Sequence, residues 1–258
     1  MAGPLGTVPA ADPAIRAAGR SAASAADVWY VGVDQVPESL AVLLDDHDRA
    51  RGRRILREAD RQRFLAAWVL ARLVLGERTG VDPAALSFDR TCAHCGDRTH
   101  GKPVVETAGA GPDFSLSHVG GLAVVAVSDR AVGVDIEDAA VGEQPLASAL
   151  TERERATCAS YADFARLWTR KEALLKSVGK GLGIHPRRIE VLDSTPAELP
   201  EELGRSGDFA LCDLPLPAPY VGALAVRGPR PDLTVHEGAE LVGEAARLVS
   251  GGRSSVRG

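Results

Sequence analysis

The sequence predicts a mixed α+β (α/β) protein made of two similar halves, each a mainly antiparallel sheet packed on helices. Short apolar segments with strand-like composition recur along the chain and are separated by longer stretches with helical spacing. The expected strands cover residues 28–33, 122–127, 132–137, 189–192, 209–212 and 220–226. The tetrapeptide Val-Gly-Val-Asp occurs at residues 31–34 and again at 132–135, and helix-rich sequence follows each copy. The repeat indicates a duplicated chain with a break near residues 129–130.

Local signals set the ends of the other elements. Gly80 ends the first helix because glycine readily adopts a left-handed backbone. Thr151 and Glu154 form a capping box that opens a later helix. Asp129-Arg130 is expected to turn the chain between its flanking strands as a β-hairpin. The expected helices lie at residues 45–78, after Asp82-Pro83, after Thr151, around Glu172 and at 236–249.

The bulk properties limit the class of protein. With 258 residues, 45% of them apolar, the chain can build two small subdomains. The net charge of -5 gives no general attraction to nucleic acid or anionic membranes, and no apolar run is long enough to span a bilayer. The leader lacks the pattern of a signal peptide, so we expect a cytoplasmic protein with reduced cysteines. The expected parts are a disordered leader, an N-terminal subdomain, a C-terminal subdomain carrying the candidate metal site, and a C-terminal helix with a flexible tail, at residues 1–26, 27–129, 130–228 and 229–258.

Two acids alternate with apolar residues in the expected strand 132–137. Because side chains alternate between the faces of a strand, Asp135 and Glu137 would lie side by side on the face opposite the apolar residues. Two carboxylates at that distance repel each other unless a cation lies between them, and paired oxygen ligands suit Mg²⁺.

A third acid lies on the expected helix at residues 167–176. Glu172 and Lys176 are four positions apart and therefore share one face of that helix. A lysine kept in such an arginine-rich chain indicates a site that needs a compact ammonium. Only four of the 30 basic residues are lysine, at Lys102, Lys171, Lys176 and Lys180.

Each of these features also has a structural interpretation. Acids on the polar face of an edge strand are usually only solvated, and a Glu/Lys pair at helical spacing is usually a weak surface salt bridge. His118, which follows Ser117 near an expected strand, can be a hydrogen-bonded structural residue or a ligand contact. The segment Gly101-Lys102-Pro103 combines a close-approaching backbone, a cation and a stiff exit, which suits an anion.

Two further groups stay open. Most arginines in the basic part of the first helix are expected to be solvated or paired, and one or two facing a cleft would bind phosphate well. This group comprises Arg49, Arg51, Arg53, Arg54, Arg57, Arg61 and Arg63. Cys92 and Cys95 could form half of a zinc site with nearby histidines, but the sequence has no second Cys-x-x-Cys. A turn-rich loop with two incidental thiols is the preferred interpretation.

Four ordered blocks resemble the 4'-phosphopantetheinyl transferase superfamily, in its two-halved, Sfp-like branch. The resemblance covers residues 28–226. Trp168, which precedes the Lys-Glu-Ala core, favours a resemblance to the branch that serves peptide and polyketide synthases. The Cys-x-x-Cys loop and the leader depart from the family pattern. The blocks are Gly101-Lys102-Pro103, Phe114-Ser115-Leu116-Ser117-His118, Val132-Gly133-Val134-Asp135-Ile136-Glu137 and Trp168-Thr169-Arg170-Lys171-Glu172-Ala173-Leu174-Leu175-Lys176.

The resemblance implies transfer of the phosphopantetheine arm of coenzyme A (CoA) to a serine of an apo acyl, peptidyl or aryl carrier protein, releasing adenosine 3',5'-bisphosphate. Asp135, Glu137 and Glu172 would hold Mg²⁺, and Asp135, Glu172 and Lys176 would be catalytic. Glu172, or a water that it orients, would be the base for the serine hydroxyl. Lys176 would offset the charge that grows on the bridging oxygen. The implied contacts to CoA are Arg51, Lys102, Ser117, His118 and Lys171.

The expected assembly is a monomer whose two subdomains are related by a pseudo-twofold axis, with CoA in the cleft between them. The expected partners are CoA and carrier proteins, without nucleic acid or membrane. One alternative is a catalytically silent module that binds CoA or a carrier protein. Another is a zinc-ribbon nucleic-acid binder, which would depend on Cys92, Cys95 and the arginines.

Overall fold

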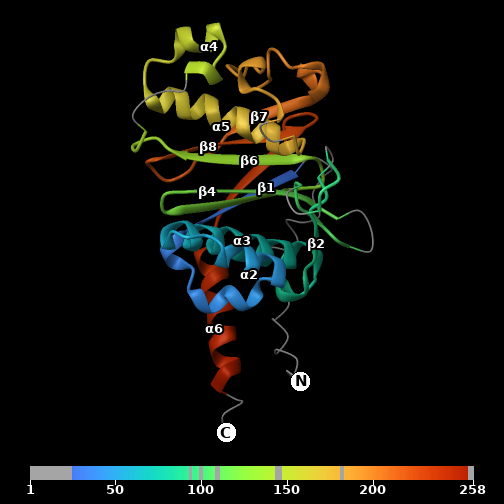
Figure 1. Cartoon of the computed structure of the whole chain (residues 1–258), viewed down its shortest axis with the longest axis vertical. Helices are drawn as coiled ribbons and strands as arrows, with labels where there is room; N and C mark the ends of the chain where they lie inside the picture. Colours follow the sequence, from blue (N-terminus) through green and yellow to red (C-terminus); the bar gives the residue numbers. More distant parts are fainter. Residues whose placement is uncertain are drawn as a thin grey trace.

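Two sheets stack face to face and helices cover the outer face of each, so the layers run helix, sheet, sheet, helix (Figure 1). The computed structural model describes residues 25–92, 95–98, 101–107, 111–142, 147–180 and 183–254. Residues 1–24 of the expected leader, together with His94 and His100, lie outside these residues. Within the described part, no helix combines the length and the apolar composition needed to cross a membrane.

The first sheet has the strand order β4-β5-β1-β9. β5 pairs antiparallel with both of its neighbours, whereas β9 runs parallel to β1. Because β9 and α6 come from the end of the chain, the C-terminal segment packs with the N-terminal half. The strands are β1 (Ala25–Gly32), β4 (Asp113–Val119), β5 (Leu122–Ser128) and β9 (Asp232–Glu237), and the helices on this side are α2 (Asp46–Arg53), α3 (Glu58–Thr79) and α6 (Ala239–Ser254).

The second sheet has the order β6-β8-β7, and both of its pairings are antiparallel. It comprises β6 (Val132–Asp138), β8 (Tyr220–Arg227) and β7 (Phe209–Asp213), with α4 (Glu152–Thr157) and α5 (Tyr161–Ser177) on its outer side. The shorter elements are β2 (Phe88–Asp89), β3 (Val104–Val105) and the 3-10 helices η1 (Val33–Gln35), η2 (Glu38–Leu43), η3 (Pro83–Ala85), η4 (Ala147–Ala149), η6 (Pro186–Arg188), η7 (Glu201–Leu203) and η8 (Ser206–Asp208).

The two halves repeat one topology. In each half a first strand leads to a long helix and then to two antiparallel strands, and the last strand lies between the other two. The order β4-β5-β1 therefore corresponds to β7-β8-β6. The copies of Val-Gly-Val-Asp do not occupy equivalent places, because residues 31–34 leave β1 whereas residues 132–135 open β6. The mixed α+β architecture with antiparallel sheets on helices is confirmed, although the repeat lies in the topology rather than in that tetrapeptide.

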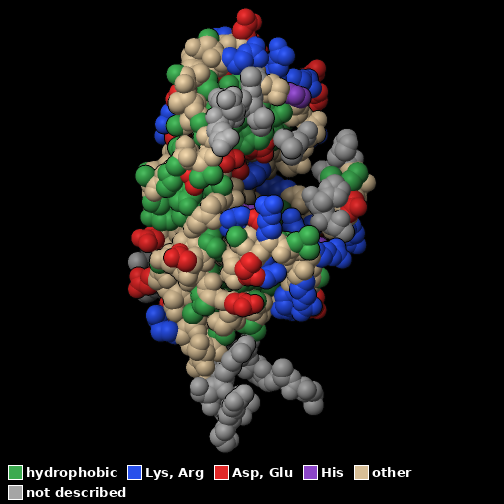
Figure 2. All heavy atoms as spheres, turned by 60° about the vertical axis from the view of Figure 1, so that its left-hand side comes forward, with side chains coloured by type: hydrophobic (Ala, Val, Ile, Leu, Met, Phe, Trp, Pro, Cys, Tyr) green, Lys and Arg blue, Asp and Glu red, His purple; other side chains and the backbone are tan. Residues whose placement is uncertain are grey.

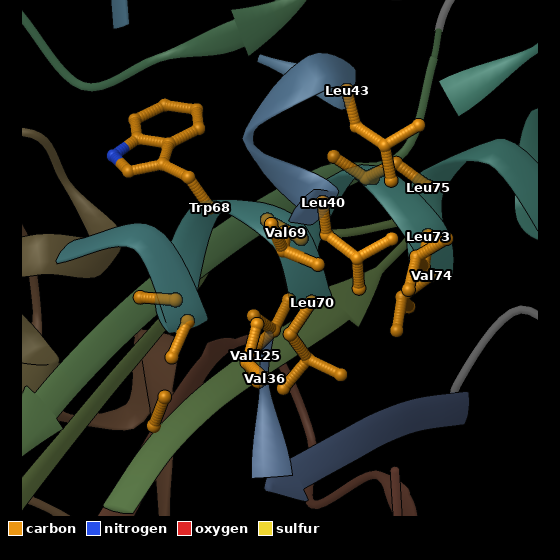
Figure 3. Packing of buried hydrophobic residues seen from close by; sticks show 14 of the residues in the cluster. Val36, Leu40, Leu43, Trp68, Val69, Leu70, Leu73, Val74, Leu75 and Val125 are labelled. Carbon is orange, nitrogen blue, oxygen red and sulfur yellow. The ribbon is translucent and has the colours of Figure 1, made fainter. Parts of the chain in front are cut away.

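The largest apolar core lies between the first sheet and its helices. α3 is buried on nearly every side from Phe64 to Gly76, because the sheet lies below it and η2 and α6 pack around it. Figure 3 shows side chains of η2, α3 and β5 interlocked in this core. Gly80 ends α3 with a φ of 74°, as its position in the sequence predicts. The capping box at Thr151 and Glu154 is confirmed as well.

A second core fills the space between the two sheets. Val132, Val134 and Ile136 of β6 point into it, towards apolar residues of β1 and β5. The alternation read from residues 132–137 is therefore correct. The opposite face of β6 does not meet open solvent but lies under α5.

The hairpin expected at Asp129-Arg130 is wrong. β5 pairs with β4 and β1, whereas β6 pairs with β8, so the chain crosses from the first sheet to the second at this turn. The hairpin of this region joins β4 to β5 instead, which places His118 near the end of a strand rather than at its beginning. Two adjacent apolar strands do not reveal from their sequence whether they pair with each other or with distant partners.

Two elements near the C-terminus also differ from expectation. The helix expected at 236–249 begins only at Ala239 and extends to Ser254, and residues 232–237 form strand β9. β9 is a partly exposed edge strand in which only Leu233 and Val235 alternate with polar residues, so its apolar pattern is too short to stand out from a helix start. The strand expected at 189–192 is reduced to an isolated bridge between Glu190 and Glu198.

Candidate functional site

The site is built where the edge strands of the two sheets lie side by side. Polar side chains of β4 that point towards the second sheet accept hydrogen bonds from the backbone of β6, as the backbone of a neighbouring strand would. Asp113 Oδ2 accepts the Val132 backbone N–H at 2.9 Å, and Ser115 Oγ accepts that of Val134 at 3.1 Å. Because these contacts satisfy the free edge of β6, they hold β4 and β6 in one register.

Gly133 lets α5 approach the other face of β6. A Cβ atom at this position would lie 2.0 Å from the backbone oxygen of Ala173. Such a close approach of helix to strand is available only to glycine. Because Gly133, Asp135 and Glu137 alternate onto one face, the contact places both acids beneath α5. Sequence reasoning missed Gly133, although a glycine inside a strand signals close backbone approach.

Asp135 is held by donors from both sides. Its side chain is buried, and Oδ1 accepts from Ser117 Oγ at 2.9 Å and from Lys176 Nζ at 2.6 Å. Ser117 comes from β4 and Lys176 from α5. The structure therefore brings Ser117, Asp135 and Lys176 together from three separate elements. Glu172 lies on the same face of α5 as Lys176.

Glu137 and Glu172 are electrostatically coupled to Asp135. Burial, followed by the charge of Asp135, raises the pKa of Glu172 above its ordinary value, and Lys176 only partly opposes this. Burial and Asp135 likewise raise the pKa of Glu137. Glu172 Oε1 is buried and has no hydrogen-bond partner among the residues that the structure describes. Only Asp135 pairs directly with Lys176, and the oxygens of the three acids do not all lie within 4.8 Å of one another. Three coupled carboxylates with one unpartnered oxygen nevertheless form a donor set whose chemistry fits a divalent cation.

A second acid group is packed more tightly but is already neutralised. Among the described residues, Asp45, His47 and Asp48 have ligand atoms within 4.8 Å of one another, and no other group of three or more His, Cys, Asp or Glu has this spacing. Both oxygens of Asp48 accept from Arg90 at 2.8 Å, and Asp45 accepts from Arg72 at 2.6 Å. This group is a buried ion-pair network rather than a metal site.

A pocket of about 540 Å³ opens beside Glu137. It lies between the N-termini of α3 and α5, the β4–β5 hairpin and the end of β6. On the face shown in Figure 2, acidic and basic side chains lie together in a hollow at about mid-height of the molecule. The pocket is lined by Asp60, Arg63, His118, Val119, Gly120, Glu137, Asp138, Val141, Gly142 and Tyr161.

His118 and Arg63 line this pocket, and Arg63 pairs there with Asp60 and donates to the Gly120 carbonyl at 3.3 Å. Burial, followed by the charges of Lys176 and Arg63, lowers the pKa of His118, so the neutral imidazole is favoured. Arg63 is the member of the basic segment that reaches the pocket. Arg51 does not line it: its side chain is exposed, and its guanidinium lies 5.5 Å from the centre of the Phe64 ring. From the sequence alone, one arginine among seven on the same segment could not be singled out.

The ammonium groups of two of the predicted lysines are bonded to other groups of the protein. Lys102 Nζ donates to Asp113 Oδ2 at 2.5 Å and to the Val132 carbonyl at 2.8 Å, so it links the starts of β4 and β6. Lys171 is completely buried and pairs with Glu154, at a distance of 2.6 Å. The structure does not bring Lys171 to the pocket.

Comparisons with known proteins agree on one family. The model of the 4'-phosphopantetheinyl transferase superfamily matches residues 131–223, which include β6 and α5. The 4'-phosphopantetheinyl transferase HetI of Nostoc sp. is 32% identical over 219 residues, covering 78% of this chain and 87% of HetI. A 4'-phosphopantetheinyl transferase of Bacillus subtilis is 32% identical over 53% of this chain and 60% of its own length. The human L-aminoadipate-semialdehyde dehydrogenase-phosphopantetheinyl transferase is 28% identical over 54% of this chain and 49% of its own.

Proposed function

The chain belongs to the 4'-phosphopantetheinyl transferase superfamily, and we propose that it is an enzyme of that activity. In this proposal it transfers the phosphopantetheine arm of CoA to a serine of an apo acyl or peptidyl carrier protein and releases adenosine 3',5'-bisphosphate. The observation that carries the proposal is the electrostatic coupling of Asp135, Glu137 and Glu172, with Lys176 paired to Asp135, beside a pocket lined by His118 and Arg63.

Asp135, Glu137 and Glu172 are the residues that would hold Mg²⁺. When bound, the ion would neutralise the CoA pyrophosphate and polarise the phosphorus that is attacked. The unpartnered Oε1 of Glu172 supports this assignment, because a buried carboxylate oxygen without a donor is costly to keep. The raised pKa values of Glu137 and Glu172 support it too, since a cation would relieve the same repulsion.

Each neighbouring side chain has a role that follows from its position. Lys176 Nζ, now on Asp135, is near enough to donate to an oxygen on which negative charge grows. Glu172, or a water that it orients, is the candidate acceptor for the proton of the carrier serine. Ser117 orients Asp135 through their hydrogen bond.

His118 and Arg63 are the candidate contacts to the phosphates of CoA. Neutral His118 would supply one ring N–H as a donor, and Arg63 would bind a phosphate oxygen in exchange for its pairing with Asp60. Lys102 would act by fixing β4 to β6, because its ammonium is already bonded within the protein. The contact of Arg51 with the CoA phosphates stays a prediction.

The experiment is transfer to an apo carrier protein, followed by intact mass spectrometry. Asp135→Asn and Glu172→Gln should each slow transfer by at least roughly 10²–10³-fold, because each removes a charge aimed at the reacting phosphate and its metal. Glu240→Gln, an exposed acid on α6, is the matched control and should transfer at the wild-type rate. Undiminished transfer by both site variants would remove this mechanism. Wild-type protein that binds CoA without any turnover would instead favour the silent binding module.

A further inference from the structure

The ammonium of Lys171 is fully used inside the protein. It donates to Glu154 Oε2, at 2.6 Å, to the Ala149 carbonyl at 2.8 Å and to the Pro186 carbonyl at 3.0 Å. An ammonium has three protons, so no donor is left for a ligand. Both side chains of the ion pair are completely buried. The lysine that precedes Glu172 therefore acts within the fold.

Glu154 is equally saturated. Its Oε2 also accepts the Thr151 backbone N–H at 2.8 Å, and its Oε1 accepts the Val191 backbone N–H at 2.9 Å. The carboxylate thus joins the start of α4 to the segment that follows η6. Through Lys171, both segments are attached to the middle of α5.

The pair is placed to control how α5 is rotated. Successive residues of an α-helix point about 100° apart, so Lys171 and Glu172 leave α5 in different directions. Lys171 points to the α4 side, and Glu172 interacts electrostatically with Asp135 and Glu137. A rotation of α5 that took Glu172 away from these acids would also pull Lys171 from its three acceptors. Breaking a buried ion pair is strongly unfavourable, which opposes that rotation.

Stability alone does not explain why a charged pair is present. Replacing a buried ion pair with packed apolar side chains is often neutral or stabilising. An apolar pair would fill the same space, but it lacks directed bonds and would tolerate small rotations of the helix. The three acceptors of Lys171 come from three separate segments, so they define one orientation of its side chain.

We propose that Glu154 and Lys171 are a positioning pair that fixes the rotation of α5, so that the Glu172 carboxylate faces Asp135 and Glu137. The role rests on the proposed function, because it concerns the geometry of the same acid group. Neither residue touches the substrate. Their effect is on the affinity of the acid group for its divalent cation.

The test uses the full chain and two variants. Glu154→Gln keeps the shape of the carboxylate but removes its charge, and the double variant Glu154→Gln/Lys171→Met removes both charges and leaves no buried ion. The control is Leu211→Ala, which truncates a buried side chain of β7 in the core shared with α5. The readouts are Mn²⁺ binding by EPR in the presence of CoA, the Mg²⁺ dependence of transfer, and the melting temperature.

Both pair variants should bind Mn²⁺ roughly 10–100-fold more weakly, the usual result of losing a group that orients a metal ligand. The Mg²⁺ concentration for half-maximal transfer should rise by a similar factor, whereas the KM for CoA stays near the wild-type value. Leu211→Ala should lower the melting temperature and leave Mn²⁺ affinity unchanged. Wild-type Mn²⁺ affinity in both pair variants would overturn the positioning role, as would a loss no greater than that of Leu211→Ala. A wild-type protein that neither binds Mn²⁺ nor transfers would overturn the proposed function itself.

Discussion

The two halves of the molecule each bury a group of acids, and the two groups are balanced differently. In the N-terminal half, Asp45 and Asp48 face Arg72 and Arg90, so that two carboxylates meet two guanidinium groups. Burial raises the pKa of Asp48 even though Arg90 attracts its charge, which shows how deeply the network is withdrawn from water. The charges of this group are therefore balanced within the group.

In the C-terminal half the acids outnumber the cations. Lys176 pairs with Asp135 and only partly offsets the charges of Glu137 and Glu172, and within the described part of the chain one oxygen of Glu172 has no partner. The difference teaches that the spacing of acids does not by itself identify a cation site. The more tightly packed group is structural, and the group with uncompensated charge is the one that fits a divalent ion.

Removing Arg90 should give the largest effect on stability. The change Arg90→Met leaves Asp48 buried with most of its hydrogen bonds lost, so we expect the free energy of unfolding to fall by about 3–5 kcal/mol. Urea denaturation followed by circular dichroism measures it. The control is Arg188→Met, because Arg188 and its partner Glu202 are both about half exposed, and a surface pair of this kind contributes little to stability. Equal losses in the two variants would contradict the description of the N-terminal group as a closed buried network.

Gly133→Ala should give the next largest effect and should damage the other acid group. The new methyl group would meet the Ala173 carbonyl at 2.0 Å, so α5 must move away from β6. We expect a loss of roughly 1–3 kcal/mol, typical of overpacking, together with a strong loss of transfer. Thermal unfolding and the mass-based transfer assay measure the two effects. Gly207→Ala is the matched control, since a Cβ there meets nothing within 4 Å. If Gly133→Ala transferred at the wild-type rate, the close contact of α5 with β6 would not be needed for the geometry of the acid group.

The sequence predicts those parts of the site that depend on local pattern. The alternation of residues 132–137 identifies both the buried face of β6 and the acid pair. The capping box at Thr151 and the glycine that ends α3 depend on neighbours a few positions away, and both are confirmed. The motif that carries Glu172 and Lys176 places both on one helical face.

The parts that could not be predicted depend on how strands pair and where side chains point in the tertiary structure. Nothing in residues 122–137 shows that β5 and β6 belong to different sheets. Lys171 and Glu172 are adjacent in sequence, yet one enters a buried network and the other faces the acids. The single helix expected at 45–78 is wrong, because it is interrupted between α2 and α3. Arg51 lies on α2 and Arg63 on α3, and only Arg63 lines the pocket.

The smallest expected effect concerns the metal-free protein and its dependence on pH. The folded state raises the pKa of Glu137 and Glu172 above the ordinary value of 4.5, so it binds their protons more tightly than the unfolded state does. Stability is therefore lost as pH rises from about the ordinary value through the raised ones. Glu172→Gln removes one of these charges, and in EDTA at pH 7 it should raise the melting temperature slightly, because an uncharged amide is not repelled by Asp135 and Glu137 and costs less to bury than a carboxylate.

The effect of Glu172→Gln on stability should differ from that of the same change at an ordinary surface acid. Glu202→Gln is the control. A hydrogen bond from its own backbone N–H, followed by Arg188, lowers the pKa of the exposed Glu202, so this acid gives stability above its ordinary pKa and loses it as pH falls. Thermal unfolding in EDTA between pH 4 and pH 8 should show a flatter decline for Glu172→Gln and no gain for Glu202→Gln. Adding Mg²⁺ should raise the melting temperature of the wild type more than that of Glu172→Gln, since the ion binds the folded state through this acid. A Glu172→Gln protein no more stable than the wild type in EDTA at pH 7 would mean that Lys176 already balances the three acids, and the contrast between the two halves would disappear.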